Sequence, residues 1–298
     1  MAGRGAFLNL VTPGLKTVFF TQLKIAKTMF QQYINLGASK RAFEDDYKIA
    51  GPGQMIQKAE GAVYTFDEPI GGDTVRYSHI TYGLGFRVTE EMLEDDLYGV
   101  MNRMSRELAK AAQYNKDVLG ASILNNAFDT NYTGYDSSAL CVSDHTPLGG
   151  GSDQSNVGAV DLSLPALQAA IEAFEGWLDD RGYHIDIEPE TLIHNTGDIW
   201  EAGEILESEF IPTSADNAKN IVRSKYGIKP MYLKFLTDTD AWFVVGRKGD
   251  HDMKMYIRKD NQFRNSEDPF NGDGIYTARQ RISKGFSDWR GVYGSPGA

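Results

Sequence analysis

The sequence is poor in the residues that build most metal and redox sites. Its 298 residues include one cysteine, Cys141, and five histidines. A single cysteine excludes an intramolecular disulfide and a cysteine-rich zinc site. A lone thiol is more often an inert packed side chain than a nucleophile, so we expect Cys141 to be packed.

Long apolar runs are also missing. No run approaches the roughly 18 residues that a membrane span needs, and the N-terminus lacks the apolar core and cleavage site of a signal peptide. The chain is 41% hydrophobic and 24% charged, which is ordinary for a soluble globular protein. We therefore expect synthesis in the cytoplasm, no membrane partner and room for two domains.

Acidic residues outnumber basic ones, but unevenly. The net charge is −11, yet residues 1–43 hold six basic residues and no acidic one, and residues 44–246 carry −20. A chain this acidic is not a general nucleic-acid binder, although its basic N-terminal segment could contact phosphates or an acidic partner.

The segment from Thr89 to about Ala127 predicts one long helix. Thr89 can cap it, and Glu90 and Glu91 follow where the helix dipole favours negative charge. Unbroken, it would be about 58 Å long, which indicates an elongated molecule; two helices broken at Gly99 are the alternative. Apolar residues recur in steps of three and four, which predicts one buried stripe. The stripe comprises Leu93, Leu97, Met101, Met104, Leu108, Ala111, Val118 and the small residue Ser122, with Asn115 as its one polar break.

The N-terminal segment predicts an amphipathic helix. Its apolar residues are Leu15, Phe19, Leu23, Ala26, Phe30 and Ile34. They fall at helical spacing, with lysines on the other face. Two interpretations stay open: a core helix, or an arm that docks on a neighbouring subunit.

Residues 51–69 mix glycine and proline with short β-prone pieces and have no large apolar cluster of their own. They predict a long exposed loop that becomes ordered against another subunit. The sequence GGD at 71–73 predicts a tight turn, and residues 74–88 predict a strand leading into the long helix.

A second, mixed α/β unit follows a polar loop at 129–160. Ser163 and Pro165 predict the start of a helix that ends at Gly182. Strands are expected near 185–187 and at TLIHN, then a short helix at 198–207, then strands at KPMYLKFL, AWFVVG and MKMYIR. The closing residues predict two strands separated by Lys284-Gly285, which return to the long helix.

Few residues have metal-ligand spacing. The candidates are Asp144 with His145, and the alternating His184, Asp186 and Glu188, which period two places on one strand face. A solvated strand face is the favoured interpretation. The sequence has no phosphate-binding glycine loop, nucleophile elbow or HExxH motif. We therefore expect no catalytic residue, metal or cofactor.

The order of these parts resembles a tailed-bacteriophage major capsid protein, nearest to the Mu-type major head subunits. The resemblance is carried by the basic arm, the loop with its GGD, the long helix, SDHTPLGG, TLIHNTGDIWEAGEILES and the closing strand pair. It implies an α+β, Hong Kong 97-like capsid fold with a long spine helix.

The resemblance also implies a domain plan. Its parts are an N-terminal arm (1–50), an extended loop (51–73), a peripheral domain (74–131 and 247–298) and an axial domain inserted between them (132–246). Residues implied in assembly are Phe19, Leu23, Phe30, Gly71 and Gly72, and the implied spine core is Leu93, Leu97, Met104 and Leu108.

The implied function is self-assembly into hexamers and pentamers of an icosahedral virion shell around phage double-stranded DNA. Scaffold, portal and decoration proteins are the implied partners, and packaged DNA would be close without being read. Two alternatives stay open: a bacterial nanocompartment shell protein, and a metal-dependent hydrolase using His145, His184 and Asp186.

Overall fold

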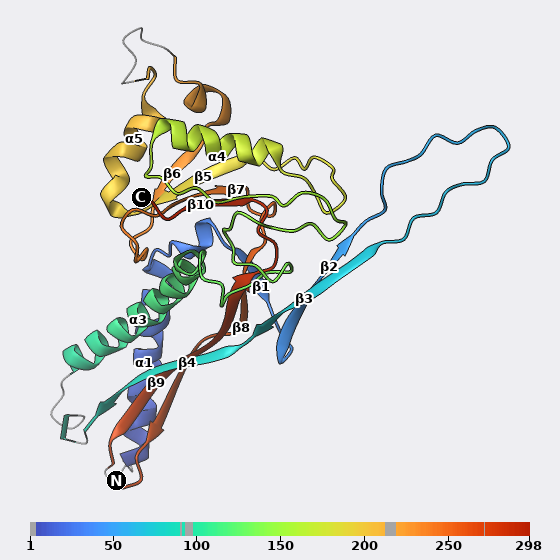
Figure 1. Cartoon of the computed structure of the whole chain (residues 1–298). Helices are drawn as coiled ribbons and strands as arrows, with labels where there is room; N and C mark the ends of the chain where they lie inside the picture. Colours follow the sequence, from blue (N-terminus) through green and yellow to red (C-terminus); the bar gives the residue numbers. More distant parts are fainter. Residues whose placement is uncertain (1–3, 90, 93–97, 212–218, 271) are drawn as a thin grey trace.

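The computed structural model describes residues 4–89, 91–92, 98–211, 219–270 and 272–298. Two four-stranded sheets form the body, and a two-stranded hairpin projects from it (Figure 1). Helices pack on both sheets, so the expected α+β class is confirmed. None of the helices in the described ranges combines the length and apolar character that a bilayer crossing requires.

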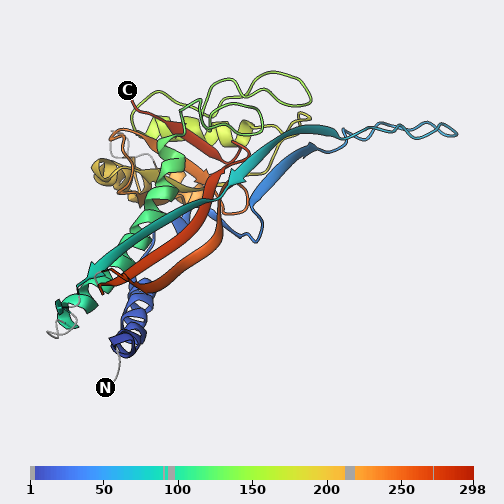
Figure 2. The ribbon, with the colours of Figure 1, turned by 90° about the horizontal axis from the view of Figure 1, so that it is seen from below.

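The lower sheet joins strands from both ends of the chain. Its order is β1 (Asn35–Ala38), β8 (Met253–Glu267), β9 (Gly274–Phe286) and β4 (Ile80–Val88). Only the β1–β8 pair is parallel among these three pairings. Helices α1 (Arg4–Ile25) and α3 (Tyr98–Asn125) run beside this sheet (Figures 1 and 2). Their shared core includes Leu15, Phe19, Met101, Leu108, Tyr276 and Ala278.

The long helix is only partly as predicted. Helix α3 (Tyr98–Asn125) begins only one residue before Gly99, so a break at this glycine stays untested. Thr89 accepts a hydrogen bond from the Met92 N–H. Leu93 and Leu97 lie outside the described residues. Leu108 is buried, but Met104 is 43% exposed, so its assignment to the core is wrong for this subunit. The buried stripe instead includes Ser105, whose hydroxyl donates to the Leu15 carbonyl, and this orientation turns Met104 outward.

The N-terminal segment is a core helix. Phe19 and Phe30 are 0% and 1% exposed and Leu23 is half-buried. The Asp117 carboxylate of α3 accepts the N–H groups of Met29 and Phe30, which fixes the turn after α1. The expectation that Phe19 and Phe30 contact a neighbouring subunit is therefore wrong, because their partners lie within the same chain.

The projecting hairpin pairs β2 (Phe43–Ala50) with β3 (Ile70–Ser78). Gly71 and Gly72 lie in β3, so the predicted tight turn is wrong. A β-carbon at Gly71 would overlap the Tyr47 hydroxyl, and one at Gly72 would overlap Leu148. These glycines permit close approach of side chains rather than a turn.

The predicted strand at 74–88 is divided at His79, where the chain passes from the hairpin to the lower sheet. The His79 imidazole is buried between the hydroxyls of Ser39 and Ser283, each 2.9 Å away. These two hydrogen bonds hold the junction between the hairpin and β4.

The upper sheet has the order β10 (Val292–Ser295), β7 (Trp242–Gly246), β5 (Pro189–His194) and β6 (Lys229–Tyr232). Helices α4 (Leu164–Gly176) and α5 (Ile199–Glu207) pack on it, together with the short turns η2 (Thr196–Asp198) and η3 (Val222–Tyr226). The Ser163 cap is present, since its hydroxyl accepts the Ala166 N–H. However, α4 ends at Gly176 because Trp177 is extended, and Gly182 lies in a later turn at φ 82°.

The closing strands differ from the prediction. Strand β9 passes through Lys284-Gly285 and ends at Phe286, and β10 then joins the upper sheet beside β7. The C-terminal residues therefore do not all return to the long helix. They tie the two sheets together instead.

A buried histidine predicts acid sensitivity. Burial, followed by the charge of Lys248, lowers the pKa of His251 from 6.5 to about 4. Between pH 4 and pH 6.5 the His251 imidazole is mostly protonated in the unfolded chain and mostly neutral in the folded chain. Unfolding should therefore become easier by about 3 kcal/mol as pH falls from 6.5 to 4. Urea unfolding across this range should show a flatter profile for His251→Gln, whereas an unchanged profile would contradict the assignment.

Candidate assembly surfaces

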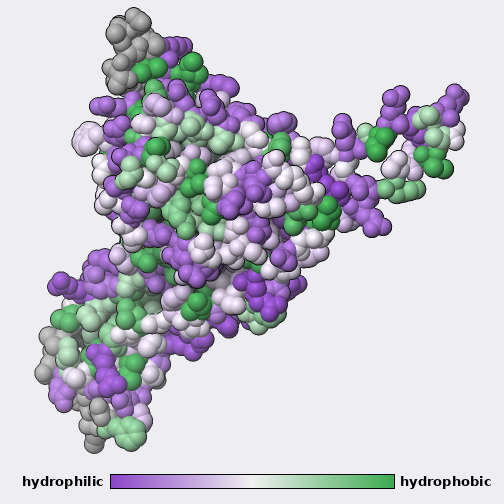
Figure 3. Space-filling view, in the orientation of Figure 1, coloured by the Kyte–Doolittle hydropathy of each residue, from purple (hydrophilic) through white to green (hydrophobic). Residues whose placement is uncertain are grey.

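The loop of the projecting hairpin exposes large apolar side chains. Residues 51–69 extend far from the body in both views (Figures 1 and 2). Met55, Val63 and Phe66 are 98%, 89% and 91% exposed. Figure 3 shows apolar residues along this loop among polar ones. Since water contact of apolar area costs about 25 cal/mol per Å², this loop gains stability when another surface covers it.

Both ends of the loop are fastened to the upper unit by Arg181. Its guanidinium donates to the carbonyls of Gly51, at 3.0 Å, and Glu68, at 2.6 Å. It also pairs with Asp67 at 3.5 Å, and Asp67 accepts the Gly53 N–H at 2.6 Å. These contacts hold the two ends of the loop together at its base, while the apolar side chains farther along the loop stay exposed.

An ion network holds the hairpin beneath this base. The Lys48 ammonium of β2 lies 2.9 Å from Asp180 and 2.7 Å from Asp288, and Arg290 lies 3.2 Å from both carboxylates. Burial alone would raise the pKa of Asp288, but the charges of Arg290 and Lys48 outweigh it and lower the pKa. The network joins the hairpin, the turn after α4 and the C-terminal segment, and so sets the direction in which the hairpin points.

A second apolar surface lies on α5. Trp200 is 84% exposed, and Ile199 and Tyr232 are 40% and 43% exposed. These three residues border a hollow of about 250 Å³. An exposed tryptophan next to a hollow is a common feature of surfaces that bind another protein.

Residues 72–295, from β3 to β10, match the family model of phage capsid proteins. The chain belongs to this phage capsid protein family. No curated protein matches the chain.

Solved structures agree on the fold of this capsid protein. It is similar to the capsid of Myoviridae phage XM1, with 11% identity, a TM-score of 0.57 and coverage of 92% of each chain. It is also similar to the procapsid of bacteriophage JBD30, with 13% identity, a TM-score of 0.52 and coverage of 96% of this chain and 75% of that one. A virus-like particle from Pyrococcus furiosus has 9% identity, a TM-score of 0.52 and coverage of 94% and 97%. The expected Hong Kong 97-like capsid fold is confirmed.

The sequence-predicted metal candidates do not come together as a site in this capsid protein. His184, Asp186 and Glu188 are exposed on a segment that lies outside the named strands, and Asp144 points to solvent beside the buried His145. Within the described ranges, no group of three histidine, cysteine, aspartate or glutamate residues is placed to hold a metal ion. Cys141 is buried, and burial raises the pKa of its thiol.

His145 instead closes the polar loop at 129–160. One ring nitrogen lies 2.5 Å from the Asp136 carboxylate, and the other lies 3.0 Å from the Asn156 side-chain oxygen. The ring also stacks on Trp289, with centroids 4.3 Å apart. With both nitrogens engaged, His145 has a structural role.

Asn156 is the hydrogen-bonding centre of this loop, and sequence reasoning missed it. Its fully buried amide donates to the carbonyls of Leu140 and Val292 and accepts the Val142 N–H. These bonds join the loop to β10. The only signal in the sequence was a long loop rich in Asn, Asp and Ser, which does not single out one residue.

Asn156→Ala is expected to destabilise the subunit by about 2–4 kcal/mol, because it leaves several buried backbone groups without partners. A thermal melt followed by circular dichroism measures the loss. Ser152→Ala, in the exposed part of the same loop, should change the melt little. Equal melts for the two variants would contradict this role.

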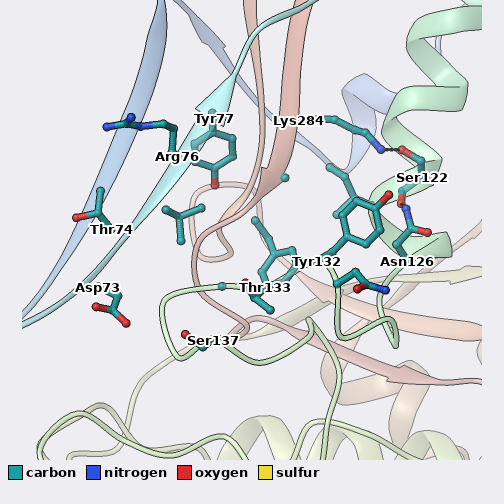
Figure 4. A pocket seen from close by; sticks show the side chains of 16 residues that line it. Asp73, Thr74, Arg76, Tyr77, Ser122, Asn126, Tyr132, Thr133, Ser137 and Lys284 are labelled. Carbon is teal, nitrogen blue, oxygen red and sulfur yellow. Dashed lines mark hydrogen bonds between the residues drawn. The ribbon is translucent and has the colours of Figure 1, made fainter.

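A pocket of about 470 Å³ lies where the hairpin, the end of α3 and β9 meet (Figure 4). The Lys284 ammonium points into it and donates to the Ser122 hydroxyl. Burial lowers the pKa of Lys284, and no ion pair of this lysine occurs in the part of the chain that the structure describes. A half-buried ammonium that lacks a carboxylate partner costs stability at neutral pH.

Lys284→Met is expected to raise the melting temperature at pH 7 by roughly 2–4 °C, because it removes this cost. The folded pKa lies below the unfolded value, so wild-type stability should rise with pH as this lysine loses its proton. The variant should lack that rise. Lys259→Met, at an exposed site, is the control, and a lower melt for Lys284→Met would refute the account.

Proposed function

We propose that this capsid protein forms the hexamers and pentamers of an icosahedral virion shell that encloses phage double-stranded DNA. The single observation that carries the proposal is the projecting hairpin, whose base is held by hydrogen bonds and whose loop exposes apolar side chains that no described residue of its own chain covers. Contacts between such a projection and a different surface of the next copy are heterologous, and they close into rings or shells when the geometry permits.

The units of the fold suggest roles within the shell. We assign the lower sheet with α3 to the peripheral domain, the upper sheet to the axial domain around capsomer centres, and residues 51–73 to the extended loop. Strand β10 then belongs to the axial domain, although most of 247–298 is peripheral. Residues 1–50 contribute α1, β1 and β2 to the subunit itself rather than a free arm.

Scaffold, portal and decoration proteins are further proposed partners. Packaged DNA would be close to the shell without being read. The charge of −20 across residues 44–246 disfavours tight binding of DNA by this part of the chain.

A nanocompartment shell is the second candidate, because the chain is also similar to a virus-like particle from Pyrococcus furiosus, a particle that is not named as a phage capsid. The family match favours the phage capsid. A metal-dependent hydrolase is not supported, because both ring nitrogens of His145 are hydrogen-bonded.

Electron microscopy of the purified protein tests the proposal. Capsomers, tubes or closed shells are expected, and a monomer at all salt and protein concentrations would refute it. Particles recovered from producing cells should contain nuclease-resistant double-stranded DNA. Particles filled with enzyme cargo and free of DNA would favour the nanocompartment.

A further inference from the structure

The hollow of about 250 Å³ on the upper unit lies between α5 and β6, the last strand of its sheet (Figure 1). Helix α5 contributes Trp200, Gly203 and Glu207 to it. These residues recur in steps of three and four and so share one face of the helix. Pockets for drug-sized ligands usually measure about 300–1,000 Å³. This hollow is therefore suited to a smaller molecule.

Aromatic rings border the hollow. The Trp200 indole is 84% exposed, and the Tyr232 ring of β6 is 43% exposed. The face of an aromatic ring attracts a cation, and indole does so most strongly. The Lys234 ammonium already lies 5.8 Å from the centroid of the Tyr232 ring, whereas Trp200 has no such partner within the described ranges. The indole is therefore available to a cationic ligand.

The charge around the hollow is negative. Residues 198–209 include five acidic residues and no basic one. One of them, Glu207, lines the hollow and is the last residue of α5, where the helix dipole adds a partial negative charge. Among the described residues, no lysine or arginine lines the hollow. A positively charged ligand is therefore favoured over a neutral or an acidic one.

A buried acceptor belongs to the same lining. His194, the last residue of β5, is only 2% exposed. Its Nδ1 lies 2.7 Å from the Asn195 carbonyl oxygen. A carbonyl oxygen can only accept, so Nδ1 carries the proton and Nε2 of the neutral ring is an acceptor. None of the described residues donates to Nε2, so a ligand with an N–H group is favoured.

We propose that this hollow binds a small organic cation, an aliphatic amine or guanidine with a short apolar stem. The cationic head stacks on the Trp200 indole and donates to the Glu207 carboxylate and to Nε2 of His194. The stem lies along Ile199 and Pro230, which also line the hollow. Each group of the ligand thus meets a group of matching chemistry in the lining.

A second protein is a poorer occupant than a small cation. The core of a protein–protein interface is depleted in charged residues. Here three glutamates, Glu201, Glu204 and Glu207, lie on α5 within about two turns of Trp200. The inference concerns the separate subunit and does not depend on the formation of a shell.

Tryptophan fluorescence of the full-length, dissociated subunit tests the proposal. The other three tryptophans, Trp177, Trp242 and Trp289, are at most 4% exposed, so acrylamide quenches Trp200 selectively. Butylguanidinium is the probe, and butylurea, its uncharged isostere, is the control ligand. At about 0.15 M salt, which screens distant charges, butylguanidinium should protect Trp200 from acrylamide in a saturable way. Butylurea should not protect it.

Variants of α5 locate the binding site. By isothermal titration calorimetry, Glu207→Gln should weaken butylguanidinium binding about tenfold, or about 1.4 kcal/mol. Glu201→Gln is the matched control, since it makes the same change of charge on the same helix outside the lining, and its effect should stay below about twofold. Gly203→Leu should fill the hollow and abolish binding while the thermal melt is kept, because a β-carbon at Gly203 meets no atom within 4 Å.

Several results would overturn the proposal. Equal weakening by the two glutamine variants would indicate general attraction to an acidic surface. Equal protection by butylurea, or full binding to Gly203→Leu, would place the ligand elsewhere. No binding to the subunit, together with loss of acrylamide quenching on assembly, would assign Trp200 to a contact between copies. None of these results bears on the shell function, which electron microscopy tests separately.

Discussion

A chain that lacks residues 1–34 is expected to lose its cooperative thermal melt and to accumulate as insoluble protein. Phe19, Phe30 and Ile34 are at most 1% exposed and pack against α3 and both sheets. Removal of one buried phenylalanine typically costs about 3–5 kcal/mol, and a whole domain is stable by only about 5–15 kcal/mol. Circular dichroism and sedimentation of the truncated chain measure the effect.

Point variants make this test specific. Phe19→Ala alone should lower the melting temperature strongly, whereas Lys16→Ala, on the exposed side of the same helix, should not. A soluble truncated chain with an unchanged melt would restore the interpretation of this segment as an arm for a neighbouring subunit.

Replacement of residues 53–67 by a short glycine linker should abolish closed particles and leave the subunit as stable as before. The apolar side chains of this loop have exposed fractions near those of an unfolded chain, so the folded subunit loses little packing. The anchors of Arg181 on Gly51 and Glu68 remain in place. Electron microscopy measures particle formation, and a thermal melt of the same sample measures the stability of the subunit.

Full-length loop variants separate side-chain contacts from loop length. Met55→Ser with Phe66→Ser should impair assembly, whereas Gln57→Ala with Lys58→Ala should not, because the first pair removes large apolar side chains and the second pair removes polar ones. Closed particles from the shortened chain would show that the loop is dispensable and would remove the observation on which the shell proposal rests.

Local patterns in the sequence predicted much of the upper unit. Ser163 caps α4, TLIH forms the last four residues of β5, and AWFVVG contains β7, since caps and short apolar runs act over a few residues. The sequence did not fix which face of the long helix is buried, because apolar residues in steps of three and four fit more than one face of a helix. Ser105 fell outside an apolar pattern, yet its hydroxyl is buried against the Leu15 carbonyl.

Long-range contacts account for the remaining errors. Gly71 and Gly72 predicted a turn, but side chains of Tyr47 and Leu148 explain why glycine is needed there. The sequence left the N-terminal segment open between core and arm, because the residues that bury Phe19 come from α3 and β9.

The lower sheet also determines when this protein becomes a subunit. Asn35 pairs with Lys254 and Ile80 pairs with Ile282, so the first strands find their partners only after most of the chain has left the ribosome. At about 5–20 residues per second, the apolar faces of α1 and α3 wait for many seconds before β8 and β9 cover them. Pairings this distant in sequence also fold slowly. During synthesis an unfinished chain therefore exposes apolar surface that can aggregate or bind chaperones, and this surface is covered only when the C-terminal strands complete the lower sheet.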